Sequence, residues 1–394
     1  DTGQVQQVVE CARREGVAIV PSGGRTGLSG GAVAADGEWV LSLDKLREMG
    51  EPDPVNGSIR VGAGVATGAL QEKAADADLF YAVDFSASDS SQVGGNIATN
   101  AGGIRVLRYG LTRDQVLGLT AVTGSGEVLE LNHGLLKNAT GYDFRHLLVG
   151  SEGTLAIITA AEMKLLPAPA PATVMLFGLS GHEALMPLFS AARKRLRLSA
   201  FEFFSQPCVE HVCAEAGLSP PLDEPCPYYA LLEFDGDPEG GEESALALFE
   251  QAMEEGWASD GVVSQSEGQA HDLWAYRERI SESIAVRKPY KNDIAVRIAD
   301  VPEFLSELDE IVRSRYPDFE VLWYGHIGDG NLHMNVLSPE SMDYERFLEA
   351  CEEVSQQVFE SIGRHKGSIS AEHGVGILKR PYLHYSRSQQ EIEL

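Results

Sequence analysis

Two histidines, His326 and His333, lie on either side of an Asp-Gly pair in the segment HIGDGNLHMN. Asp-Gly between two apolar runs is a strong signal for a two-residue β-hairpin turn, so Asp329 and Gly330 are expected at its centre. In that register residue 326 pairs directly with residue 333, and cross-strand partners have Cβ atoms about 4.5–5.5 Å apart. Asn335 follows on the same face. A single histidine would more often be structural, but two in this register are expected to share one metal ion.

A third candidate ligand lies in the segment SAEHGVG, where Glu372 and His373 follow a strand candidate, GSIS. Two histidines and one carboxylate that leave a coordination position open form a catalytic pattern, with zinc as the expected ion. Manganese and iron are also compatible with these ligands. The alternative is a charged strand end that faces solvent.

Glycine-rich loops mark the first half of the chain. The segment PSGGRTGLSGGA, residues 21–32, follows an apolar strand candidate and offers backbone amides that can form an anion-binding nest. VGGNIATNAGG, residues 93–103, and GSEGT, residues 150–154, are two further loops of this kind. Three such loops suit a dinucleotide better than a single phosphate. For the first loop alone, a flexible surface loop would be the alternative.

A Rossmann nucleotide site is a competing interpretation, because Gly62, Gly64 and Gly68 follow a strand candidate. Their spacing is G-x-G-x-x-x-G, one residue longer than the fingerprint. These glycines are therefore expected to be structural.

Arg277 falls within the apolar stripe of a helix that spans DLWAYRERISESIAV, and Ser281 lies one turn later. A guanidinium on a buried face needs an anion, either an internal carboxylate or a ligand. Lys291 offers a second cation in PYKNDIAVRI. If the strand starts before residue 291, Lys291 alternates out of step with Ile294 and points to the other face.

The elements that must position these residues predict an α+β fold in two domains, residues 1–168 and residues 169–394. The boundary is the proline-rich connector LLPAPAPAT, residues 165–173. The first domain combines short strand candidates with glycine loops and few helices. In the second, strands and helices alternate, which predicts an antiparallel sheet covered by helices, on one face in the simplest case.

Composition excludes several classes of protein. With 31 Lys and Arg against 59 Asp and Glu, the formal charge of −28 opposes binding to nucleic acid or an anionic membrane. No stretch approaches the roughly 18 apolar residues of a membrane span. The five cysteines lack CxxC spacing, which favours a reducing, cytoplasmic location. The chain begins in an amphipathic helix and stops within a helical pattern, so we expect the native protein to continue at both ends.

The glycine loops, together with KNATGYD and LLVGSEGTLAIIT, resemble the FAD domain of vanillyl-alcohol-oxidase type flavoproteins, in the branch of the D-lactate, glycolate and D-2-hydroxyglutarate dehydrogenases. The resemblance implies an FAD-binding domain in two parts over residues 1–168, followed by a substrate or cap domain over residues 169–394 whose end returns toward the flavin. It also implies that the first loop holds the FAD phosphates and that later loops contact the rest of FAD. Some members of this family attach FAD covalently through a His or Cys side chain. Residues 21–32 contain neither, so a non-covalent cofactor is expected. The implied FAD-binding residues are Pro21, Ser22, Gly23, Gly24, Arg25, Thr26, Gly27, Gly94, Gly95, Asn96, Thr99, Asn100, Gly103, Gly153 and Ile157.

The same resemblance extends to HIGDGNLHMN and SAEHGVGILK. It implies His326, His333 and Glu372 as metal ligands, His373 as the catalytic base and Asn335 as a substrate contact. Arg277, Ser281 and Lys291 are similar to the clamp for the distal carboxylate in the D-2-hydroxyglutarate branch, and two cations favour a dicarboxylate.

The expected reaction is oxidation of a D-2-hydroxy acid to the 2-oxo acid, with hydride transfer to flavin N5. D-2-hydroxyglutarate is the first candidate substrate; lactate, malate and glycolate stay open. An external acceptor, either an electron-transferring flavoprotein or a quinone, would take the electrons, and a homodimer is one expectation for the assembly. A non-catalytic flavin-binding subunit and a zinc hydrolase are the alternatives.

Overall fold

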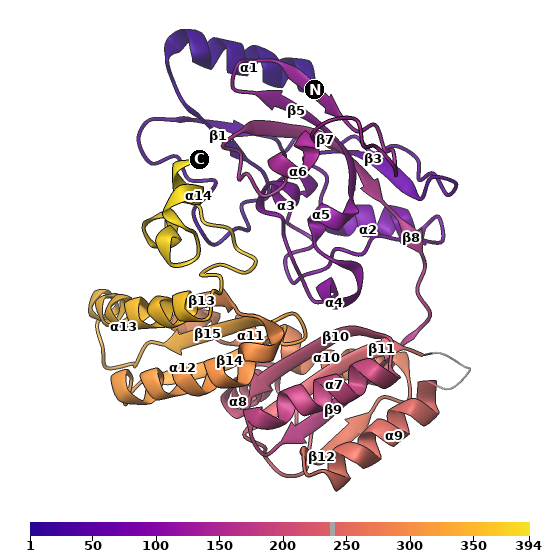
Figure 1. Ribbon diagram of the computed structural model, residues 1–394, viewed down its shortest axis with the longest axis vertical. Coiled ribbons are helices and arrows are strands. Elements are labelled where there is room, and N and C mark those ends of the chain that lie inside the picture. The colour runs from indigo at the N-terminus through magenta and orange to yellow at the C-terminus, as the bar shows by residue number, and fades with distance from the viewer. Residues whose placement is uncertain (237–240) are drawn as a thin grey trace. The chain divides into compact units, whose positions relative to one another are not determined.

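The computed structural model describes residues 1–236 and 241–394, and the chain divides into two compact units. Unit 1 comprises Asp1–Ala168 and Glu372–Arg380, and unit 2 comprises Pro169–Ala371 and Pro381–Leu394 (Figure 1). The segment Glu372–Arg380 is therefore part of the first unit although it lies near the end of the sequence.

Unit 1 is built on a four-stranded antiparallel sheet in the order β3-β7-β5-β6. Its core joins Ile59 and Met163 of the sheet to Val9 of α1 and to Ile97 of α3. Helix α1 begins at Thr2 because the carboxylate of Asp1 accepts a hydrogen bond from the Gln4 amide. The strands are β1 (Ile19–Ser22), β2 (Trp39–Ser42), β3 (Ser58–Gly62), β4 (Leu79–Phe80), β5 (Val116–Thr123), β6 (Val128–Leu131), β7 (Ala156–Lys164) and β8 (Leu166–Pro167). The helices are α1 (Thr2–Glu15), α2 (Thr67–Ala75), α3 (Val93–Thr99), α4 (Val106–Tyr109), α5 (Thr112–Gln115) and α6 (Phe144–Leu148).

Unit 2 is built on a seven-stranded antiparallel sheet in the order β12-β9-β11-β10-β14-β15-β13. The strands are β9 (Ala172–Leu179), β10 (Leu198–Ser205), β11 (Tyr228–Asp235), β12 (Ala258–Val263), β13 (Tyr290–Ala295), β14 (Glu320–Gly325) and β15 (Asn331–Leu337). The helices are η1 (His182–Ala184), α7 (Leu185–Arg195), α8 (Gln206–Ala216), α9 (Gly241–Glu254), α10 (Glu267–Glu278), α11 (Ile280–Ser283), η2 (Ala285–Arg287), η3 (Ile298–Asp300), α12 (Val301–Arg315), α13 (Tyr344–Arg364) and α14 (Gln389–Glu393). A last 3₁₀ helix, η4 (Arg380–Tyr385), begins at the final residue of unit 1.

Helices cover both faces of this sheet, which corrects the simplest expectation of one covered face. Phe201 and Glu202 are neighbours in β10 and therefore point to opposite faces. Phe201 packs against Phe189 of α7, whereas Glu202 pairs with Arg277 of α10. The sheet can be covered on both sides because its strands are apolar on both faces, with every residue of β10 buried.

The longest helix, α13, shows how the sequence determines where a covering helix begins and which of its faces is buried. Asp343 caps its first turn by accepting hydrogen bonds from the Glu345 and Arg346 amides. Phe347, Cys351 and Val358 recur at helical spacing and are buried, as expected for a helix that covers a sheet. Figure 1 shows α12 and α13 side by side in unit 2. Among the described residues, no helix is both long and apolar enough to cross a membrane.

Candidate active site

A cavity of about 490 Å³ lies in unit 1, among the glycine loops. Its size and glycine-rich wall fit a cofactor site. Most residues that the sequence implies for FAD line it, and Glu372 and His373 line it too. The implied residues in the wall are Pro21, Gly23, Gly24, Arg25, Thr26, Gly27, Gly94, Gly95, Asn96, Thr99, Gly153 and Ile157.

Three of the implied FAD residues are not in the cavity wall. Ser22 is buried at the end of β1. Asn100 ends α3 in a left-handed conformation, and its side-chain oxygen accepts a hydrogen bond from the Arg113 amide. Gly103 has a φ of +136°, and a Cβ there would meet Asp84 O at 2.1 Å.

The chemistry of the wall fits FAD. A Cβ at Gly27 or Gly95 would meet no atom within 4 Å, so backbone amides at these positions border open space where a phosphate or ring can approach. The buried side-chain oxygen Oε1 of Gln92 lines the same cavity and has no hydrogen-bond partner among the described residues. A buried acceptor without a partner favours a ligand that donates a hydrogen bond.

A side chain at Gly24 should weaken the binding of FAD in this cavity. A Cβ there would meet Ser90 O at 2.1 Å, a backbone atom that cannot move aside cheaply. Overpacking of this kind costs about 1–3 kcal/mol, so Gly24→Ala should weaken FAD binding about 5- to 150-fold. Titration of the apoprotein with FAD measures the effect. Gly124→Ala is the matched control, because a Cβ at Gly124 meets nothing within 4 Å. Equal FAD affinity in the two variants would contradict the prediction.

Ser29 and Glu152 bind the segment around and after His373 to the glycine loops, through contacts that the sequence did not predict. Ser29 Oγ donates a hydrogen bond to His373 O at 2.7 Å. The two carboxylate oxygens of Glu152 accept hydrogen bonds from the Val375 and Gly376 amides, each at 3.0 Å. Glu152 has a φ of +51°, an unusual conformation for a residue with a side chain. A carboxylate between glycines in GSEGT was the available signal.

The hairpin that carries the two histidines differs from the expected one. His333 pairs with Tyr324, not with residue 326, and His326 belongs to the five-residue loop 326–330. The Asn331 amide donates to His326 O at 3.3 Å, which closes this wider turn. The two imidazoles nevertheless approach each other, with ring centroids 5.5 Å apart. The direct cross-strand pairing was wrong, but the proximity of the histidines does not depend on it.

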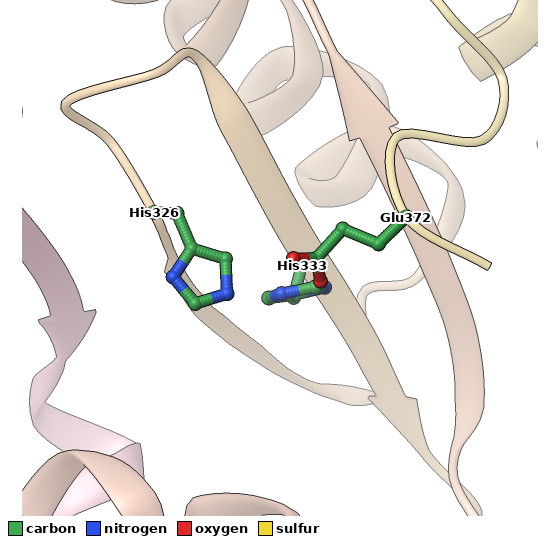
Figure 2. Close-up of side chains that lie close together, drawn as sticks. All are labelled: His326, His333 and Glu372. Atoms are coloured by element: carbon green, nitrogen blue, oxygen red, sulfur yellow. The ribbon is translucent and has the colours of Figure 1, made fainter. Parts of the chain in front are cut away.

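The side chain of Glu372 lies near the two histidines, but the segment GSIS that precedes it is not the strand that the sequence predicted. GSIS forms a single bridge between Ser368 and Ala295 instead of a strand. The Ala371 amide then donates to Asp293 O at 3.3 Å, which fixes the position from which Glu372 extends. His326, His333 and Glu372 offer ligand atoms that all lie within 4.8 Å of one another (Figure 2).

This donor set fits a divalent metal ion. Ligand atoms about 2.1 Å from a zinc ion lie at most about 4.2 Å apart, so a small adjustment would bring all three into contact with one ion. Both histidines also have a buried carboxylate next to Nδ1: Glu202 Oε1 is 2.9 Å from His326, and Asp293 Oδ1 is 3.8 Å from His333. A carboxylate at hydrogen-bond distance from Nδ1, as Glu202 is for His326, is typical of histidines that bind metal through Nε2, whereas the 3.8 Å between Asp293 and His333 is longer than a hydrogen bond.

The face of the sheet that carries His333 also carries the expected substrate contacts of β13 and β15. Lys291 pairs with Asn335 across the two strands, and Asp293 pairs with His333. Because β13 begins at Tyr290, Lys291 lies on the face away from Ile294, which is the face of His333. Asn335 is 1% exposed, and neither polar atom of its amide has a hydrogen-bond partner among the described residues. Lys291 is exposed on this face, and desolvation by the surrounding side chains lowers its pKa.

Arg277 and Ser281 border this face from the helices above it. The expected single helix is interrupted at Arg279, so Arg277 lies in α10 and Ser281 in α11. Arg277 Nε donates to Glu202 at 2.8 Å, and its guanidinium lies over the ring of Tyr324. Ser281 Oγ is 3.0 Å from the hydroxyl of Tyr324, whose pKa is raised by burial. The internal salt bridge that the sequence left open therefore exists, and within the described chain the two Nη groups of Arg277 make no hydrogen bond.

Glu202 is the clearest residue of the site that sequence reasoning missed. It is a buried carboxylate that contacts both His326 and Arg277. The signal was present in LSAFEFFS, where one charge interrupts an apolar strand. Buried charges are rare unless they are paired, so such a residue is a candidate for a functional role.

The α+β fold and the glycine-lined cavity suit a dinucleotide cofactor, and comparison with known families identifies an FAD-dependent oxidoreductase. Residues 1–132 match an FAD binding domain, and residues 168–394 match the C-terminal domain of FAD linked oxidases. The chain therefore belongs to the family of FAD-linked oxidases, consistent with the vanillyl-alcohol-oxidase type.

Individual relatives agree with this assignment. A D-2-hydroxyglutarate dehydrogenase from Xanthomonas citri is 52% identical over 99% of this chain and 83% of the relative. A D-2-hydroxyglutarate dehydrogenase from Stutzerimonas stutzeri is 51% identical over 99% of this chain and 84% of the relative. Among solved structures, p-cresol methylhydroxylase with substrate bound has a TM-score of 0.77 at 13% identity, over 100% of this chain and 83% of that chain, which supports the fold alone.

Proposed function

We propose that the protein oxidises D-2-hydroxyglutarate to its 2-oxo acid, with FAD and a divalent metal ion, most simply zinc. The observation that carries this proposal is the convergence of His326, His333 and Glu372 within 4.8 Å, with the proposed base His373 next in the chain. Glu372 and His373 also line the glycine-rich cavity, so adjacent residues serve the metal cluster and the cofactor site. The names of the relatives support the same activity.

The proposed binding of substrate uses both of its carboxylates. His326, His333 and Glu372 would hold the ion, which when bound supplies Lewis-acid stabilisation of charge on the 2-hydroxyl oxygen. The amide of Asn335 lacks partners among the described residues and is available to the C1 carboxylate or the hydroxyl. The Nη groups of Arg277, the hydroxyl of Ser281 and the ammonium of Lys291 would bind the distal carboxylate, because guanidinium and ammonium donors suit an anion.

His373 would accept the proton of the 2-hydroxyl as general base. FAD, held by the residues of the glycine-lined cavity, would supply the acceptor for the hydride of C2. Ser29 and Glu152 would keep His373 in place by fixing the backbone on either side of the turn that follows it. Since an oxidised flavin is needed for each turnover, the enzyme requires an external electron acceptor, which we propose to be an electron-transferring flavoprotein or a quinone.

Anaerobic reduction of the bound flavin tests the proposal. D-2-hydroxyglutarate should bleach the flavin absorbance faster than D-lactate, D-malate or glycolate, and L-2-hydroxyglutarate should not. Chelation of the metal should abolish bleaching, and zinc should restore it. Faster bleaching by lactate or glycolate would assign a different 2-hydroxy acid as the substrate. Bleaching at an unchanged rate in the presence of the chelator would refute the proposed metal requirement.

Lys291 gives a more specific prediction about the substrate. Lys291→Met removes one charged hydrogen bond to the distal carboxylate, worth about 1.5–3 kcal/mol, so the KM for D-2-hydroxyglutarate should rise roughly 10- to 150-fold. The KM for D-lactate should stay the same, since lactate has no second carboxylate. Lys194→Met, on the exposed side of α7, is the control. Equal effects on both substrates would contradict the proposed contact.

A further inference from the structure

Glu202 joins two parts of the candidate site that come from different elements. Its side chain is 1% exposed at the centre of β10. One oxygen, Oε1, is 2.9 Å from His326 Nδ1, in the loop between β14 and β15. The other oxygen, Oε2, accepts a hydrogen bond of 2.8 Å from Arg277 Nε, in α10. A single carboxylate therefore bridges a proposed metal ligand and the proposed anchor of the distal carboxylate.

The surroundings hold this bridge in one geometry. The Arg277 guanidinium lies 4.9 Å from the centre of the Tyr324 ring, and Tyr324 is the cross-strand partner of His333. The two oxygens of a rigid carboxylate move together, so a displacement of Arg277 also displaces the acceptor of His326. A buried charge of this kind is costly unless each oxygen is well paired.

We propose that Glu202 is a positioning residue that couples metal binding to recognition of the distal carboxylate. This inference rests on the proposed function, since it assigns the metal to His326 and the carboxylate to Arg277. A carboxylate at Nδ1 fixes the tautomer in which Nε2 carries the lone pair for the ion. The same carboxylate accepts the hydrogen bond from Nε of Arg277, so the two Nη groups of the planar guanidinium can bind a ligand. Coupling of this kind is reciprocal, so substrate dicarboxylate and metal should tighten each other's binding.

The diagnostic variant is Glu202→Gln in the FAD-loaded protein. An amide offers one acceptor oxygen and one NH2 group, so one of the two donors, His326 or Arg277, must face another donor. Zinc affinity, measured by competition with a chelator, should fall about 10- to 100-fold. The ratio of kcat/KM for D-2-hydroxyglutarate over D-lactate, measured at saturating zinc, should fall about tenfold.

Two further variants separate this role from general stability. Glu202→Asp keeps the charge beside Arg277 but is too short to span both donors, so zinc affinity and substrate preference should both fall while the protein still folds and binds FAD. Glu233→Gln is the matched control: Glu233 is a buried carboxylate of the adjacent strand β11, and it accepts from Ser199 and from Trp274 of α10. It should leave zinc affinity and substrate preference unchanged.

The outcomes distinguish this inference from the proposed function. If the wild-type protein does not bind zinc, the proposed metal site fails, and the coupling fails with it. If the wild type binds zinc and prefers the dicarboxylate, but Glu202→Gln and Glu202→Asp keep both properties, only the role of Glu202 is refuted. A loss of zinc affinity with unchanged substrate preference, or the same losses in Glu233→Gln, would also overturn the coupling.

Discussion

Replacement of His326 by asparagine should reduce turnover by at least about a thousandfold and remove most of the bound metal. The reason is that a metal ion acting as Lewis acid is worth several kcal/mol in the transition state, and three protein ligands are the usual minimum for a catalytic ion. FAD should stay bound, because His326 belongs to the loop after β14, whereas the cavity is lined by residues of unit 1. Metal analysis, flavin absorbance and anaerobic bleaching measure the three quantities in one preparation.

The matched control for this variant is His211→Asn. His211 lies in α8 and pairs with Glu320 at 2.8 Å, a partly exposed pair that contributes little to stability. It should keep the metal, the flavin and the turnover of the wild type. A His326→Asn protein with full turnover and no metal would refute the metal assignment, and loss of the flavin together with the metal would show that the variant disturbs the fold.

Replacement of His373 by alanine should lower kcat about 100- to 10,000-fold, the usual contribution of a general base. Zinc content and FAD content should be unchanged, since neither the cluster nor most of the cavity wall depends on this imidazole. Added imidazole should restore part of the rate, because a small base can enter the space that the side chain leaves. Single-turnover flavin reduction is the appropriate measurement, since it isolates the chemical step.

His384→Ala is the control for this second variant, because His384 is an exposed histidine in the same region of sequence. It should leave flavin reduction unchanged. Retention of more than about a tenth of the wild-type rate by His373→Ala would argue against a general base at this position. A loss that imidazole does not rescue, accompanied by loss of zinc, would assign His373 a structural role beside Glu372.

Local sequence patterns predicted much of the fold. The α+β class and the FAD cofactor are confirmed. Both could be predicted because their signals are short-range: capped helices such as α13, apolar strands, and glycine loops whose backbone can approach a ligand. Gly24 illustrates why such signals are reliable, since a side chain at that position would strike Ser90 O. The metal ligands and substrate contacts stay predictions.

The sequence could not predict features that depend on neighbours far along the chain. The Asp-Gly motif predicts a two-residue turn, but Gly330 lies against Val296, which donates to Gly330 O at 3.1 Å. That packing, and the bond from Asn331 Nδ2 to Ile294 O at 2.9 Å, hold the chain in a five-residue loop. Local preference sets the candidates for a turn, but contacts to a third segment choose among them.

From residue types and spacing alone, the chain specifies its strands, its flavin loops and the set of side chains that could bind an ion. Only tertiary structure decides that Glu372 joins His326 and His333, and that Glu202 lies between His326 and Arg277. The physical reason is that periodicity reports which face of an element a residue occupies, whereas the distance between two elements depends on how the whole sheet and its helices pack.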